Sequence, residues 1–219
     1  MEIIHFDLFN LHLQEPIALL TNWLIASFSF FAFFQLKRYQ TIFENYWKTF
    51  YLILGISMIF GGLGHLFFHY AGIYGKFPSW TLGVTAGIFS SFAMISIWPN
   101  EKQRIHLKRF VVIKSLLMIS LALATRKFVF VAIDTSFAYI IFCGYMGIRL
   151  FKKGFAGMNY IALGVLVLFP SALFFGLKIN LHRFLNKDDI SHLFMVGCIA
   201  CFYLGITRTD KNQLLAAQK

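Results

Sequence analysis

Charged side chains are scarce in this chain: Asp, Glu, Lys and Arg together make up only 13% of its 219 residues, whereas 58% are hydrophobic. Soluble globular domains carry about 25% charged residues, so the composition excludes one. The net charge of +11 would suggest a nucleic-acid partner in a soluble protein. Here the Lys and Arg residues stand in short gaps between long apolar segments, a pattern that membrane topology explains. The composition therefore predicts an integral membrane protein without a nucleic-acid partner.

Cysteines, glycosylation acceptors and N-terminal basic residues are also few or missing. The three cysteines are an odd number and stand in apolar segments, which excludes a disulfide framework. No Lys or Arg precedes Lys37, so we expect no cleavable signal peptide, which needs a positive start. The absence of an Asn-x-Ser/Thr acceptor favours the inner (plasma) membrane of a bacterium.

Seven apolar segments approach the length of about 20 residues that crosses the hydrocarbon of a membrane. Cut at charged residues, Gly and Pro, they span residues 16–36, 47–72, 79–98, 110–125, 128–150, 157–177 and 188–207. The fourth segment contains Lys114, which we expect to snorkel to the nearer interface. The connections are short, so consecutive helices should be antiparallel neighbours. The sequence predicts an all-α fold with a single domain over residues 1–219, a seven-helix transmembrane bundle.

Basic residues are distributed unevenly between alternate gaps. The gaps after the first, third and fifth segments, together with the C-terminal tail, hold the larger share of Lys and Arg, whereas the N-terminal arm carries Glu2, Asp7 and Glu15. Basic residues accumulate on the cytoplasmic side of a membrane. We therefore predict an N-terminus outside and a C-terminus inside.

Two histidines lie four residues apart in the second segment, where residues 60–70 read FGGLGHLFFHY. Residues at this spacing are neighbours on one face of an α-helix, so His65 and His69 should face the same neighbouring helices. An ionisable side chain inside a membrane is by default a functional hypothesis. The glycines before the histidines allow another helix to approach closely. The segment therefore predicts one half of a polar site.

Other polar residues are expected at the same depth in the bundle. His192 follows Asp188 by one turn at the start of the seventh segment, and Asp134 lies roughly 9 Å into the fifth. A catalytic zinc ion takes three His or carboxylate ligands and lowers the pKa of its bound water to about 7. We therefore predict one zinc ion on His65, His69 and His192, with Asp188 as a further ligand. Asp134 or Asp188 would be the general base.

Structural roles explain each of these residues when it is taken alone. A transmembrane histidine often only hydrogen-bonds to a neighbouring helix, and Asp188 and Asp189 stand at a helix start, where carboxylates cap free N–H groups. Paired histidines could also ligate haem. What favours a zinc site is that three histidines and Asp134 are expected in one layer.

Two short stretches in these segments resemble the superfamily of seven-helix membrane hydrolases that includes the alkaline ceramidases and the adiponectin/progestin receptors. The run GLGHLFFH at 62–69 is similar to the ceramidase motif G-x-G-S-x-x-F-H, whose last histidine binds zinc, and this role carries over to His69. The run DDISHL at 188–193 resembles the H-x-x-x-H motif of the family, with His192 on its second histidine and Asp188 on its first.

A third stretch is similar to the ceramidase start, with Glu15-Pro16 after an acidic arm and Thr21-Asn22 following. The chain also departs from the family. His65 stands where the family has the serine thought to polarise the attacked carbonyl, and the expected aspartate of the third helix falls near Trp80. If the site binds metal, His65 replaces the ligand lost at Asp188, and Asp134 replaces the missing aspartate.

The polar residues and the resemblance together predict a zinc-dependent hydrolase of a membrane lipid amide or ester, in which metal-activated water attacks the carbonyl. The alternative is a non-enzymatic seven-helix receptor or sensor that keeps a structural metal or a histidine cluster. Loss of the family serine and aspartate favours this alternative. The sequence leaves the substrate and the oligomeric state open.

Overall fold

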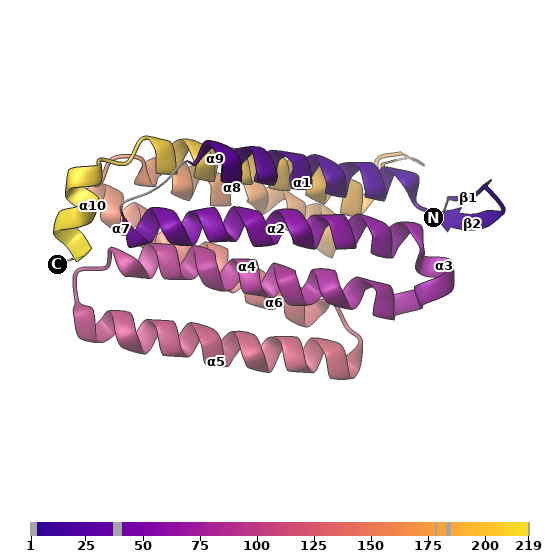
Figure 1. Cartoon of the computed structure of the whole chain (residues 1–219), viewed down its shortest axis with the longest axis horizontal. Helices are drawn as coiled ribbons and strands as arrows, with labels where there is room; N and C mark the ends of the chain where they lie inside the picture. Colours follow the sequence, from indigo (N-terminus) through magenta and orange to yellow (C-terminus); the bar gives the residue numbers. More distant parts are fainter. Residues whose placement is uncertain (1–3, 37–40, 178, 183–184, 219) are drawn as a thin grey trace.

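The protein is a long helical bundle with a short β-hairpin at one end (Figure 1). The computed structural model describes residues 4–36, 41–177, 179–182 and 185–218. Strands β1 (His5–Leu8) and β2 (Leu11–Gln14) form the antiparallel hairpin. The helices are α1 (Pro16–Gln35), α2 (Ile42–Leu66), α3 (Phe68–Ala71), the 3-10 helix η1 (Gly72–Lys76), α4 (Phe77–Ser96), α5 (Glu101–Thr125), α6 (Val129–Phe137), the π-helix η2 (Ala138–Met146), α7 (Gly147–Lys152), α8 (Met158–Gly176), α9 (Lys187–Thr207) and α10 (Lys211–Gln218).

Five helical segments are long and apolar enough to cross a membrane. They are Pro16–Gln35, Ile42–Leu66, Phe68–Ser96, Val129–Lys152 and Lys187–Thr207. α8 contributes a shorter apolar stretch, Met158–Phe174. α5 is long, but its first half is rich in basic residues. The predicted all-α class and a multi-pass membrane protein are thereby confirmed.

Most of the helices form a closed ring, with α5 outside it. α1 packs on α2, α2 on α4, α4 on η2, η2 on α8, α8 on α9, and α9 back on α1. α5 packs on α4 and α6 (Figure 1). The hairpin and α10 lie at opposite ends of the bundle, which we call the hairpin end and the α10 end.

Aromatic side chains fill the interior of the ring. Trp47, Phe50 and Tyr51 from α2 pack with Phe202 from α9, and all four are fully buried. The Tyr51 hydroxyl donates a 2.7 Å hydrogen bond to the backbone carbonyl of Ile199. This bond satisfies the one polar group of the side chain in apolar surroundings.

Two helices begin earlier than their predicted apolar segments. α2 begins at Ile42 because Thr41 caps it, accepting a hydrogen bond from the Glu44 backbone N–H at 3.3 Å. The Thr-x-x-Glu pattern is a recognisable helix start. Asn100 caps α5 in the same way, 3.0 Å from the Gln103 backbone nitrogen. The predicted segments end at charged residues, and for this reason they do not include the polar first turns of these two helices.

The prediction that His65 and His69 share one helical face is wrong. α2 ends at Leu66, and Phe67 separates it from α3. The chain then folds back so closely that a Cβ on Gly64 would lie 2.7 Å from the carbonyl oxygen of Gly75. His69 therefore lies on α3, a separate helical turn, where it is exposed.

The closest packing of α8 on α9 predicts a measurable difference between two glycines. A Cβ on Gly205 would lie 2.6 Å from Ile161 Cγ1 and 2.8 Å from the carbonyl oxygen of Gly157, whereas a Cβ on Gly83 would meet only Ser57 Oγ at 3.5 Å. We expect Gly205→Ala to destabilise the protein by about 1–3 kcal/mol through overpacking. Gly83→Ala should leave the unfolding temperature unchanged or raise it, because Ala favours a helix over Gly by about 1 kcal/mol. Thermal unfolding of both variants in detergent tests this, and equal unfolding temperatures would contradict it.

Candidate polar site at the hairpin end

Three ionisable side chains meet at the hairpin end of the bundle, and we call them the Glu15–His65–Lys76 network. His65 Nδ1 lies 2.6 Å from Glu15 Oε2. Lys76 Nζ lies 3.3 Å from Nδ1 and 3.4 Å from Nε2 of the same imidazole. When Nδ1 donates its proton to Glu15, Nε2 is the acceptor for the Lys76 ammonium. The side chains of His65 and Glu15 are only 14% and 20% exposed, so these interactions are stronger than they would be in water.

The backbone around each member explains how the network is assembled. Glu15 has φ 48° and ψ 58°, a left-handed conformation that is costly for a residue with a side chain. Its N–H donates to the carbonyl of Ile4 at 3.0 Å, and Pro16 then begins α1. Lys76 ends η1, the helix that folds back over Gly64. The hairpin, the end of α2 and η1 thus each contribute one member.

The environment of Glu15 lowers its pKa. Burial by itself raises the pKa of Glu15, but the hydrogen bond with His65 and the nearby positive charges of His65, Lys76 and Lys187 outweigh burial. The pKa therefore lies below its ordinary value of 4.5. The network holds Glu15 as a carboxylate.

His192 of α9 lies at the same end of the bundle, with partners of its own. Its Nδ1 lies 2.9 Å from Thr21 Oγ1 and 3.5 Å from Asn22 Nδ2, both on α1. The Asn22 amide is held by a 2.7 Å hydrogen bond to the carbonyl of Ala18. His192 is also within electrostatic range of His65, Asp188, Lys76 and Glu15. The second and seventh predicted segments and α1 therefore bring polar groups to one end, as we expected for His65 and His192.

The two aspartates at the start of α9 act in the structure as helix caps and ion-pair partners. Asn186 and Asp189 form a capping box, in which Asp189 Oδ2 accepts from the Asn186 backbone N–H at 3.0 Å. Asp188 Oδ1 lies 2.7 Å from Lys187 Nζ. These contacts agree with the structural role that the sequence left open for both residues. Asp189 Oδ1 is buried without a hydrogen-bond partner among the described residues.

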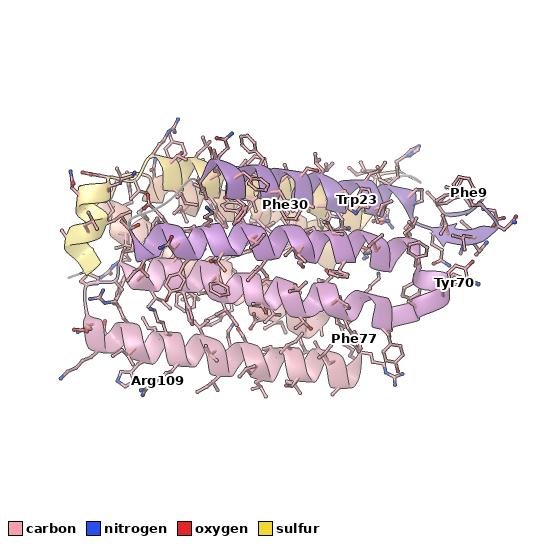
Figure 2. The ribbon with its side chains drawn as sticks, in the orientation of Figure 1. Phe9, Trp23, Phe30, Tyr70, Phe77 and Arg109 are labelled. Atoms are coloured by element: carbon pink, nitrogen blue, oxygen red, sulfur yellow. The ribbon has the colours of Figure 1, made fainter. Side chains whose placement is uncertain are left out.

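His69 belongs to a different, exposed group of side chains. Its ring makes an edge contact with His12 of β2, with centroids 4.9 Å apart. The neighbouring Tyr70 hydroxyl accepts a 2.8 Å hydrogen bond from the His12 backbone N–H, and Figure 2 shows Tyr70 beside the hairpin. His69 therefore packs α3 against the hairpin.

Asp134 lies apart from the hairpin-end network and pairs with Lys114. Lys114 Nζ is 2.5 Å from Asp134 Oδ1 and 3.1 Å from the Asp134 carbonyl oxygen. Ser115 Oγ donates to the same carboxylate oxygen at 2.9 Å. The Asp134 side chain is 0% exposed and that of Lys114 is 10% exposed. Our expectation that Lys114 snorkels to the interface is therefore wrong, because a buried carboxylate offers it a closer partner.

The predicted zinc ligands do not fit one metal ion in this arrangement. His65, His69, His192 and Asp188 each have a different set of partners. Among the residues that the structure describes, no three His, Cys, Asp or Glu side chains are grouped so that they could hold a metal ion. A zinc ion on His65 would lie about 2.0–2.1 Å from its nitrogen. A zinc ion bound there would have to displace the Lys76 ammonium, because the two cations would occupy the same side of the His65 imidazole and repel each other.

Sequence reasoning missed Lys76, the central cation of the network. A signal was present, because Lys76 is the sole Asp, Glu, Lys or Arg between Lys48 and Glu101. In the sequence it stands in a gap between two apolar segments, where a basic residue bears only on topology. The fold-back of η1 onto Gly64 carries it to His65. That contact depends on the tertiary structure.

The lowered pKa of Glu15 predicts how stability depends on pH. Because the pKa is lower in the folded chain, the contribution of Glu15 is present above the unfolded-state value of about 4.5 and is lost as the pH falls through the lower folded-state value. We expect the unfolding temperature to fall more steeply in the wild type than in Glu15→Gln as the pH decreases below about 5. Thermal unfolding in detergent over this range measures both curves. Parallel curves would mean that Glu15 is not stabilised as a carboxylate.

Comparisons with known proteins identify a family but no characterised relative. No curated protein and no solved structure matches the chain. Residues 17–211 match a family described as "Family of unknown function (DUF6962)". The matched range includes His65, Lys76 and His192, and Glu15 lies just before it. Because the match spans most of its length, the chain belongs to the family of unknown function DUF6962.

Proposed function

We propose that this protein is a non-enzymatic seven-helix membrane protein of the receptor or sensor class, in which a hydrogen-bonded ion network stands in place of a metal centre. The observation that carries the proposal is the position of Lys76. Its ammonium lies within 3.4 Å of both ring nitrogens of His65, and His65 pairs with Glu15. The Lys76 ammonium and the His65 imidazole thus already supply partners for the Glu15 carboxylate.

The network also joins an extramembrane element to the bundle, as a sensor requires. Glu15 immediately follows the hairpin, and His12 of the hairpin contacts both His69 and Tyr70 of α3. A ligand or proton that moved the hairpin would therefore act on Glu15 and, through His65 and Lys76, on the ends of α2 and η1. The strained backbone of Glu15 supports this role, because strain is stored at functional sites more often than elsewhere.

We also propose that α5 and α8 cross the membrane with the five clearly apolar segments, with the N-terminus outside and the C-terminus inside. Both helices run alongside the others in the bundle (Figure 1). The α10 end carries most of the basic side chains, which is the pattern of a cytoplasmic side. The proposed membrane is the bacterial inner membrane.

A zinc-dependent hydrolase of a lipid amide or ester is the second candidate. It is favoured by the common location of His65 and His192 and by the buried Asp189 Oδ1, which has no partner among the described residues. A zinc site at this end would require Lys76 to withdraw from His65 and Asp188 to turn from Lys187. Asp134 would not take part as a base there, because Lys114 and Ser115 hold it elsewhere.

The role of Lys76 is tested by neutralising it. Lys76→Gln removes the ammonium that contacts His65 and one of the positive charges near Glu15, and we expect a loss of about 1–3 kcal/mol of stability. Lys127→Gln is the matched control, because Lys127 is an exposed lysine just after α5, at the same end of the bundle. Thermal or urea unfolding of the two variants in one detergent provides the comparison. A Lys76→Gln variant that is more stable than the wild type, and gains zinc, would favour the hydrolase.

Metal analysis separates the two candidates directly. We expect purified protein to hold less than about a tenth of an equivalent of zinc, and a chelator to leave its unfolding temperature unchanged. One equivalent of zinc that is lost in His192→Ala, together with turnover of a lipid amide or ester that stops in the same variant, would instead establish the hydrolase.

A further inference from the structure

The buried pair of Lys114 and Asp134 leaves one carboxylate oxygen without a hydrogen-bond donor. Asp134 Oδ1 accepts from both the Lys114 ammonium and the Ser115 hydroxyl. Oδ2 is buried too, and it has no partner in the part of the chain that the structure describes. The Asp134 side chain is 0% exposed, so bulk water does not reach this oxygen. Because an unsatisfied buried carboxylate oxygen is costly, Oδ2 points to a ligand that donates a hydrogen bond.

The Lys114 and Ser115 side chains have no donor left for Oδ2. The Lys114 ammonium contacts Asp134 Oδ1 and, at 3.1 Å, the Asp134 carbonyl oxygen. Its Nζ also lies 5.2 Å from the centroid of the Phe137 ring, within the range of a cation–π interaction. The three N–H donors of an ammonium group are thereby used. The single donor of the Ser115 hydroxyl goes to Oδ1, so the donor for Oδ2 has to come from elsewhere.

Hydroxyl groups on the neighbouring helical turns donate to backbone carbonyls. Ser90 and Ser91 of α4 both donate to the Gly87 carbonyl, at 3.0 and 2.8 Å. Thr135 of α6 donates to the Val131 carbonyl at 3.0 Å. A hydroxyl group has one proton but two lone pairs. These side chains can therefore accept a hydrogen bond from a ligand, but they do not supply the donor that Oδ2 needs.

Two small residues leave space beside Oδ2. A Cβ on Gly87 of α4 would lie 4.0 Å from Asp134 Oδ2 and 3.7 Å from the Cβ of Ala138 in η2, and both are ordinary contact distances. α4 packs on both α6 and η2. The space therefore lies where these three elements meet, and a methyl group would fit there without a clash. A site this small takes a water molecule and no larger ligand.

The charges of the pair favour a neutral ligand. Since the Lys114 ammonium already balances the Asp134 carboxylate, a second cation would be repelled by the ammonium and an anion by the carboxylate. A proton on Oδ2 is no substitute. It would remove the counter-charge of an ammonium group whose side chain is only 10% exposed. Water is the small neutral molecule that donates hydrogen bonds.

We propose that one water molecule binds between α4, α6 and η2 and donates a hydrogen bond to Asp134 Oδ2. Buried waters make about three hydrogen bonds, and the hydroxyl oxygens of Ser90 and Ser91 offer acceptors on the next turn of α4. The Lys114–Asp134 pair joins α5 to α6, and the water extends this connection to α4. The site is independent of the proposed receptor role and of the network at the hairpin end.

The test compares alanine and serine at position 87. Gly87→Ala fills the space with a methyl group that donates no hydrogen bond, whereas Gly87→Ser places a hydroxyl donor there instead of the water. Gly83→Ala, one turn earlier on α4, is the matched control for helix propensity, because a Cβ there meets only Ser57 Oγ. In detergent, we expect Gly87→Ala to unfold about 2–10 °C below Gly83→Ala. Gly87→Ser should unfold above Gly87→Ala, although serine is the weaker helix former.

An experimental structure of the wild-type protein, at a resolution that shows ordered waters, tests the site without any variant. We expect a water about 2.5–3.0 Å from Asp134 Oδ2. A side-chain donor at this distance, or no density there, would overturn the site. Equal unfolding temperatures of Gly87→Ala and Gly83→Ala would also overturn it, and so would a Gly87→Ser variant that unfolds no higher than Gly87→Ala.

Discussion

The contact between the Lys76 ammonium and the His65 imidazole determines how the hairpin end of this bundle is built. It places a lysine beside a histidine that also pairs with Glu15, so that a carboxylate, an imidazole and an ammonium share one poorly hydrated space. Each member would be costly to bury alone. Together they offset that cost, and they come from the end of the hairpin, α2 and η1.

The corner depends in turn on close backbone packing. Gly64 lets η1 approach the end of α2, and Phe67 interrupts the helix just beyond His65. A continuous helix would have kept His69 beside His65 and left Lys76 further away. With the helix interrupted, His69 contacts His12 of the hairpin, and His65 contacts Glu15 of the network. One break in one helix thus separates two histidines that look like a metal-binding pair in sequence.

Charged side chains elsewhere in the bundle also have specific partners. Lys114 and Asp134 are buried together, joining the outer helix α5 to α6. At the α10 end the cations have aromatic neighbours, as with Lys153 over Trp98 and Arg208 over Tyr160. The buried Lys114 is therefore paired with a carboxylate, whereas these two cations lie over aromatic rings.

Much of the architecture could be predicted from residues alone. Apolar segments of transmembrane length predicted the helices, and the structure places most of them within a few residues. The prediction was less accurate where polar residues belong to a helix, as at the start of α5, and it gave no hairpin and no α10. His65 and His192 were correctly expected at one end. Their grouping with Glu15 and Lys76 was not, since no periodicity relates residues that meet through a loop.

The sequence by itself determined that this is a helical membrane protein, because hydrophobic length and scarcity of charge leave no other solution. It also placed His65, Asp134 and His192 within apolar segments, where the structure buries or half-buries them. Only the tertiary structure decided which of them meet. A side chain reaches only a few ångströms, so partnership depends on where helices break and how closely they pack. For that reason Lys76, and not a second histidine, is the neighbour of His65.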